Sequence, residues 1–257
     1  MRSGMLDFTI YGFICKTLEG LTYLSALLMG VFLIVLPGCM KDTHHYYPLP
    51  PAVVYDADRN AYHTVVIGSQ AWMAENLRTT RYRNGDPIFL VTDSADWASA
   101  ITGAYCNYWN LAANATIYGR LYNGHAISDG RNIAPAGWHI PSEEEWTTLT
   151  NYLGGELVAG AWLKETGFAH WVAPNMDAAD LAGFAALPAG YRNEMGWFGN
   201  QYFSAIFWSS TPYDATHTWY RYMYYNYGGM YKDFYHDLQH GFSVRCVYDI
   251  AVGDPGR

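Results

Sequence analysis

Two groups of residues have spacings known from metal sites. His236 and His240 stand four residues apart, the separation at which a helix presents two zinc ligands on one face. The stretch lies between predicted strands and has no obvious third ligand, so we expect no metal there. The D-x-D-x-N sequence at 56–60 matches the start of a calcium loop, which also needs glycine at position six and glutamate at position twelve. Those positions hold Ala61 and Ile67, so we interpret the segment as a turn.

Signatures of catalysis are missing from the sequence. It has no G-x-S-x-G nucleophile turn, no glycine-rich phosphate loop and no H-E-x-x-H motif. With 15 Lys and Arg against 23 Asp and Glu, the formal net charge is −8, and no basic block offers phosphate contacts. We therefore predict no catalytic residue, no metal, no cofactor and no nucleic-acid partner. Binding is the expected function, and an enzyme is the least favoured class.

Aromatic residues make up 17% of the sequence, and the densest run is 219–225, WYRYMYY. In a strand, Trp219, Arg221 and Met223 share one face and the tyrosines between them share the other. A small domain cannot easily bury both faces, and exposed Tyr and Trp rings stack on sugars or anchor protein partners. The alternative is that the rings fill the thin core of a loop-rich fold. The candidate ligand-binding residues are Trp219, Tyr220, Arg221, Tyr222 and Tyr224.

The N-terminal segment is predicted to carry an export signal. No charged residue occurs from Gly20 to Met40, and about 20 apolar residues could span a bilayer as a retained helix. A signal peptide is the alternative, because its apolar core ends at a cleavage site. The sequence Leu36-Pro37-Gly38-Cys39 resembles the bacterial lipobox, whose cysteine is acylated and becomes the mature N-terminus. We therefore predict a lipoprotein signal peptide over 1–38 and lipidation of Cys39 with fatty-acyl chains such as palmitate.

The segment 39–52 is expected to be a lipidated tether. Its prolines favour an extended backbone over helix or sheet, and more than one acyl chain makes membrane anchoring stable. Lys41 and Asp42 resemble the short charged signals that direct lipoproteins outward. The predicted location is the outer membrane, with the protein lipid-anchored and facing the cell surface.

Two cysteines, Cys106 and Cys246, belong to the expected mature domain. An even pair in an oxidising compartment predicts a disulfide, and two buried thiols are the alternative. A bond closing a loop of about 140 residues would contribute about 4–5 kcal/mol in the chain-entropy model.

Helix and strand signals predict an α+β domain. Ser142 and Glu145 form an S-x-x-E capping box before the helical spacing of Trp146, Leu149 and Leu153, which predicts a helix over 143–153. Further helices are expected at 93–100 and 157–165. The expected strands are 53–55, 62–67, 70–76, 184–187, 206–210, 219–225, 230–235 and 242–248, with a glycine-rich turn at 226–229.

Six motifs in order carry a family resemblance. They are VIGSQAWMAENL at 66–77, GRLYN at 119–123, AGWHIPS at 136–142, LPAGYR at 187–192, FWSST at 207–211 and GFSVRCV at 241–247. Together they resemble the Fibrobacter succinogenes major paralogous domain, a family of bacterial lipoproteins and secreted proteins. The resemblance covers 53–249 and leaves 250–257 as a C-terminal tail.

The resemblance implies a C-type-lectin-like fold, with two helices, a small twisted antiparallel β region and long loops. It also supports the disulfide, because cysteines stand at matching places in the family. Family members resemble surface adhesion or binding proteins, although the calcium-dependent sugar motifs of C-type lectins are absent here. The expected function is non-catalytic binding of a glycan or a surface protein. The alternative is an accessory subunit of an outer-membrane barrel complex, such as a transporter or assembly machine.

Overall fold

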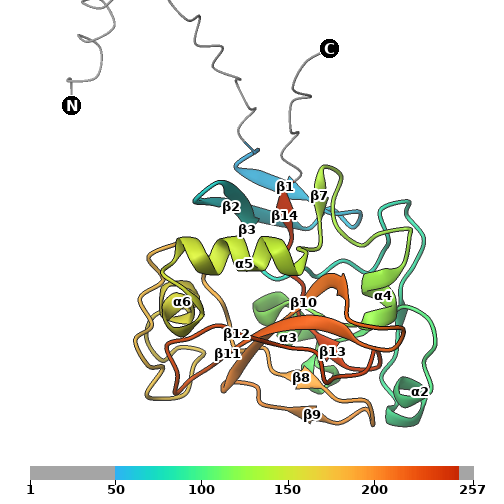
Figure 1. Ribbon diagram of the computed structural model, residues 1–257. Helices are drawn as coiled ribbons and strands as arrows, with labels where there is room; N and C mark the ends of the chain where they lie inside the picture. The colour runs from blue at the N-terminus through green and yellow to red at the C-terminus, as the bar shows by residue number, and fades with distance from the viewer. Residues whose placement is uncertain (1–49, 249–257) are drawn as a thin grey trace, which may run out of the picture. The chain divides into compact units, whose positions relative to one another are not determined.

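Strands from both ends of the described chain lie in one sheet (Figure 1). The structure is a computed structural model that describes residues 50–248. Its five-stranded sheet has the order β1-β2-β3-β14-β7, and every pairing is antiparallel. The strands are β1 Val53–Tyr55, β2 Ala61–Ile67, β3 Gln70–Met73, β7 Trp138–His139 and β14 Val247–Tyr248.

The predicted turn at 56–60 joins β1 to β2, and the Asp56 carboxylate organises it. Its Oδ1 accepts hydrogen bonds from the backbone N–H groups of Asp58 and Asn60, both at 2.9 Å. Its Oδ2 accepts the Tyr62 hydroxyl at 2.6 Å. The carboxylate therefore stabilises the turn, which confirms the interpretation made from the sequence.

In the six-stranded sheet, one arginine links strand β8 to the segment that follows β4. The strand order of this sheet is β4-β5-β6-β13-β8-β9. Arg192 on β8 is fully buried and donates hydrogen bonds to the carbonyls of residues 91–93, which directly follow β4. The guanidinium also lies 4.5 Å from the centre of the Trp97 ring. The strands are β4 Phe89–Leu90, β5 Ala104–Cys106, β6 Leu121–Asn123, β8 Tyr191–Arg192, β9 Phe198–Gly199 and β13 Gly241–Phe242.

The third sheet is the antiparallel meander β10-β11-β12. Its strands are β10 Ser204–Pro212, β11 Thr218–Tyr224 and β12 Tyr231–Asp233. The glycine-rich segment 226–229 lies between β11 and β12, as the sequence predicts. Helix α5 crosses between this meander and the five-stranded sheet (Figure 1).

Within residues 50–248 the structure has five short α-helices, where the family resemblance implied two. The capping box predicted for α5 is present: Ser142 accepts from the Glu145 backbone, and the Glu145 side chain accepts from Ser142. The mixed α+β class is thus confirmed, and the number of helices is corrected. The helices are α2 Ser94–Ala98, α3 Ala112–Tyr118, α4 Gly124–Ser128, α5 Glu143–Tyr152 and α6 Glu156–Leu163, with a 3₁₀ turn η1 at Tyr108–Asn110.

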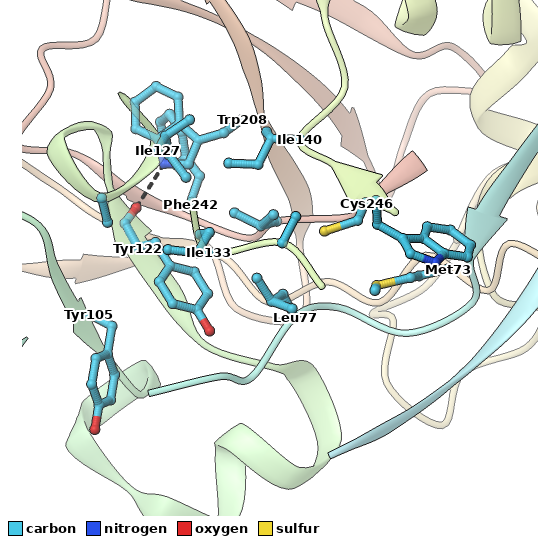
Figure 2. Close-up of a cluster of buried hydrophobic side chains, with 14 of the residues drawn as sticks. Met73, Leu77, Tyr105, Tyr122, Ile127, Ile133, Ile140, Trp208, Phe242 and Cys246 are labelled. Carbon is cyan, nitrogen blue, oxygen red and sulfur yellow. Dashed lines mark hydrogen bonds between the residues drawn. The ribbon is translucent and has the colours of Figure 1, made fainter. Parts of the chain in front are cut away.

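The largest hydrophobic cluster joins β6, β10 and β13. Figure 2 shows Trp208 and Phe242 packed together, with ring centroids 4.5 Å apart. The Trp208 indole N–H donates to the Tyr122 carbonyl at 2.7 Å (Figure 2). A buried donor with a well-placed acceptor avoids the cost of an unpaired polar group. This cluster packs the meander against strands β6 and β13.

The two cysteines of the domain lie in different parts of the core. Cys246 packs in the cluster of Figure 2, near Met73, whereas Cys106 packs in a separate cluster with Trp97. The structure holds both residues as buried thiols that are not bonded to each other, and the disulfide stays a prediction.

The predicted signal peptide, Cys39, most of the tether and the C-terminal tail lie outside the described residues. Among residues 50–248, no helix is long and apolar enough to cross a membrane.

Candidate functional site

The predicted aromatic strand is β11, and its two faces have different surroundings, as the alternation predicts. Arg221 points to the α5 side and is fully buried. Its Nε donates to Glu143 Oε2 at 3.1 Å, and its Nη1 donates to Glu156 Oε1 at 2.7 Å. Its Nη2 donates to Thr147 Oγ1 at 2.9 Å. Arg221 therefore joins the sheet to α5 and α6. The sequence-based prediction that Arg221 contacts a ligand is corrected, because its side chain is buried.

Trp219, on the same face, belongs to an aromatic group at the far end of the meander. Its ring meets Phe234 at 5.0 Å and Tyr213 at 5.5 Å between centroids. Phe234 and Tyr213 are stacked at 3.7 Å. Lys232 Nζ lies 5.3 Å from the centre of the Trp219 ring. All of these contacts are made within the domain. We therefore assign Trp219 mainly to the stability of the meander and not to ligand binding.

The opposite face of the meander carries a group of half-buried tyrosines, which we call the tyrosine face: Tyr191, Tyr222, Tyr224 and Tyr231. Tyr222 is the centre of the group, with ring centroids 5.7 Å from Tyr224 and 5.8 Å from Tyr231. Tyr191 comes from β8 and lies close enough to raise the pKa of Tyr224. Tyr220, the fifth predicted residue, is buried beneath this face, 5.1 Å from Phe242.

Two hydroxyls of the tyrosine face, those of Tyr222 and Tyr224, have a raised pKa and therefore stay protonated as hydrogen-bond donors. Burial raises the pKa of Tyr222 above its ordinary value, and the charge of Asp233 raises it further. Burial also raises the pKa of Tyr224. The Tyr224 hydroxyl accepts a long hydrogen bond from Asn200 Nδ2 at 3.5 Å. The face thus combines flat apolar rings with donors and an amide, which suits a ligand that has both apolar and hydroxyl surfaces.

A buried lysine holds the end of β11 in place. Lys164 is fully buried, and its Nζ donates to the carbonyls of Met176, Tyr224 and Tyr227 at 2.8, 3.2 and 2.8 Å. Burial lowers its pKa to about 8. Three carbonyls from two segments therefore converge on one ammonium group. This contact fixes the backbone that carries Tyr224, which is how a site is made rigid by the residues behind it.

The rings of the two histidines with zinc-like spacing pack against each other at a tilt instead. Their rings lie 4.1 Å apart, and His236 also stacks on Tyr220 at 5.0 Å. His240 Nε2 lies 3.0 Å from Glu194 Oε2. No group of three or more His, Cys, Asp or Glu residues that could hold a metal ion occurs in the described part of the chain. The pair packs against Tyr220 and Phe242, which lie beneath the tyrosine face.

Acid should destabilise the domain through His240. Burial, and secondly His236, lower the His240 pKa to about 3, below the ordinary value of 6.5. Between these values the unfolded chain binds the proton and the folded chain does not, so stability is lost as pH falls from 6.5 towards 3. The slope from this one group is about 1.4 kcal/mol per pH unit. Urea unfolding of wild type and His240→Phe across this range tests it. An equal slope in both proteins contradicts the assignment.

Sequence reasoning missed Tyr191, Tyr231 and Lys164. Tyr231 could have been found, because a hairpin around the turn at 226–229 sets it opposite Tyr222, as the observed register does. Tyr191 and Lys164 come from elements far from β11 in the sequence. No pattern of residues near β11 in the sequence predicts contacts with such distant elements.

Comparison with known proteins places the domain in a family. The family model described as the Fibrobacter succinogenes major domain matches residues 65–248. No curated protein and no solved structure matches the sequence. The match spans most of the chain and contains all the strands from β3 to β14. The chain therefore belongs to the Fibrobacter succinogenes major domain family.

Proposed function

We propose that the protein is a surface-exposed outer-membrane lipoprotein whose domain binds extracellular glycans without cleaving them, through the tyrosine face. The observation that carries the proposal is the row of half-buried tyrosine rings on a braced antiparallel sheet. Rings of this kind stack on the apolar face of a sugar, and their hydroxyls bond to its oxygens. Because Lys164 and the core fix β11, little ordering is needed when a ligand binds.

The lipid anchor is part of the same proposal. It rests on the lipobox-like sequence that ends at Cys39. Metabolic labelling with palmitate should mark the wild-type protein and not the Cys39→Ser variant. The fold is proposed to be related to the C-type-lectin-like class. Support comes from the pairing of early strands with β14 and from the long loops between short elements.

Removal of two tyrosine rings should abolish glycan binding. The probes are cellulose, chitin, xylan and mannan, and the readout is retention of the detergent-solubilised full-length protein. Each ring at the centre of a binding site contributes about 2 kcal/mol, so Tyr222→Ala with Tyr224→Ala removes about 4 kcal/mol and should weaken retention by roughly a thousandfold.

The matched control is the double variant Tyr55→Ala with Tyr152→Ala, because those rings are exposed elsewhere on the domain. Circular dichroism confirms that both double variants are folded. Unchanged retention of the tyrosine-face variant contradicts the assignment, and release of reducing ends from a retained polysaccharide contradicts non-catalytic binding.

An exposed apolar surface favours the alternative role as an accessory subunit. It surrounds α6, where two grooves meet at Trp162. The surface includes Leu157 and Leu181, both more than 70% exposed, and Val66 on β2. Thr64, two residues before Val66, donates to the Pro51 carbonyl, so the tether joins the domain beside this surface. An exposed apolar surface of this kind marks an interaction site.

This alternative predicts a stoichiometric outer-membrane barrel protein after native purification in mild detergent, identified by mass spectrometry. The Leu157→Asp variant should lose that partner, whereas Ile101→Asp should keep it, because Ile101 is exposed outside this surface. A protein that is purified alone, in wild type as in both variants, rules out the accessory role.

A further inference from the structure

Trp109 is held in a backbone conformation that a tryptophan rarely adopts. It lies in the η1 turn with φ 53° and ψ 20°, and the next residue, Asn110, has φ 56°. Both are in the left-handed region, which is unfavourable for residues with a Cβ atom. Asn110 Nδ2 donates to the Thr92 carbonyl at 3.0 Å, and Asn114 Nδ2 donates to the Tyr108 carbonyl at 2.8 Å. The surrounding structure therefore enforces the turn.

Burial of the indole does not compensate this strain, because the Trp109 side chain is 60% exposed. The ring rests on Phe198, 5.6 Å between centroids, and its other neighbour is Tyr108 at 5.9 Å. One side of the indole is thus supported and the ring is open to solvent. Strain that persists without a packing gain points to function.

The polar neighbours of the turn are amides. Gln201 donates through its backbone N–H to the Tyr108 hydroxyl at 3.3 Å, and its side chain lies 3.5 Å from Asn114 Oδ1. Gln201 is buried and supports the turn from inside the domain, whereas Asn110, the residue after Trp109, is exposed. Amides donate and accept hydrogen bonds without charge, which matches the hydroxyls of a neutral sugar, and the indole matches its apolar face.

Trp109 lies on the other side of a short connection from the tyrosine face. Asn200 contacts the Tyr224 hydroxyl, and the next residue, Gln201, contacts Tyr108 beside Trp109. Both aromatic surfaces are therefore linked to the same two residues between β9 and β10. We propose that Trp109 is a second sugar-stacking site, and that the ligand is a neutral polysaccharide long enough to contact Trp109 and the tyrosine face together. This inference rests on the proposed glycan binding.

Two sites on one rigid domain give a chain-length effect. A polymer that occupies both gains avidity, whereas a short oligosaccharide occupies one site at a time. In affinity electrophoresis of the full-length protein with soluble xylan or glucomannan, Trp109→Ala should weaken retention by about tenfold or more. The control is Trp197→Ala, since Trp197 is equally exposed in the neighbouring hairpin and has no strained backbone.

A glycine at position 109 separates function from packing. Glycine adopts positive φ without penalty, so Trp109→Gly should melt at or above the wild-type temperature and lose retention as Trp109→Ala does. A lower melting temperature with unchanged retention shows that the ring only packs on Phe198, and it overturns the inference.

The outcomes also separate this inference from the proposed function. Retention lost in Tyr222→Ala and kept in Trp109→Ala overturns the second site alone. A wild-type protein that no polysaccharide retains overturns both. Equal losses for the polymer and for its disaccharide overturn the chain-length claim.

Discussion

The Asn76→Leu variant should lose about 3–5 kcal/mol of unfolding free energy, the cost of leaving a buried charge without its partner. Arg245 is fully buried, and both Nε and Nη2 donate to Asn76 Oδ1, at 3.0 and 2.7 Å. Its Nη1 donates to the Met73 carbonyl at 3.2 Å and to the Phe184 carbonyl. Burial lowers the pKa of Arg245 below its usual range. No carboxylate is hydrogen-bonded to this guanidinium in the described structure, so the amide oxygen of Asn76 is its main acceptor.

A double-mutant cycle in urea isolates the contact between the two residues. Arg245→Met with Asn76→Leu removes the charge together with its acceptor, so the two single losses should overlap by more than about 1 kcal/mol. Asn114→Leu is the control, because that half-buried amide does not face a charge. Additive losses in the double variant contradict this account of the core.

Arg221→Met should destabilise the domain by about 3 kcal/mol and leave glycan retention of the folded protein unchanged. The loss arises because Glu143 and Glu156 would keep their charges without the buried guanidinium that now bridges them. Retention should persist because Arg221 lies on the face of β11 away from Tyr222 and Tyr224. Lys232→Met is the matched control. It removes an exposed cation 3.4 Å from the same Glu143, so the expected loss is below about 1 kcal/mol.

Urea unfolding and xylan retention, measured on the same protein samples, test this prediction. Loss of retention at full folding would return Arg221 to the ligand site that its sequence position suggested. Loss of stability with retention intact confirms that it is a bridge between β11 and the two helices.

Local signals account for the elements that the sequence predicts. The turn at 56–60 and the capping box of α5 depend on residues within a few positions of each other, and both are present. Helix α3 begins after Leu111, which makes no side-chain cap, so nothing in the sequence marks its start. The strand expected at 242–248 is divided in two, because Ser243 between the parts bridges to Phe207 instead of continuing one ladder.

The strand expected at 184–187 is not a strand. Ala186 makes a single bridge to Lys164, and Ala185 has a positive φ of 48°. The Phe184 ring lies under the Arg245 guanidinium at 4.3 Å, and residue 245 is far away in the sequence. A short apolar run predicts that its side chains are buried. It does not predict the backbone conformation, which here depends on contacts with Lys164 and Arg245.

The alternation of side chains along the strand could be predicted from the sequence. Which of its two faces is exposed could not. Alternation along 219–225 gives the two faces of β11, and the structure has them. Which face is closed depends on Glu143 and Glu156, which meet Arg221 from two helices distant in the sequence. No residue near Arg221 in the sequence indicates that contact. The pattern therefore places Arg221 among the candidate ligand-binding residues together with the tyrosines, although they lie on opposite faces of the strand.

Hydroxyl-radical footprinting of the full-length lipoprotein, with and without the polysaccharide that retains it, tests the central claim most directly. The account predicts protection of the peptides that carry Tyr222, Tyr224 and Tyr231, with Tyr55 unchanged as an exposed reference. Protection of the α6 surface around Leu157 and Trp162, with the tyrosine face as reactive as before, would contradict it and show that the α6 surface is the one occupied.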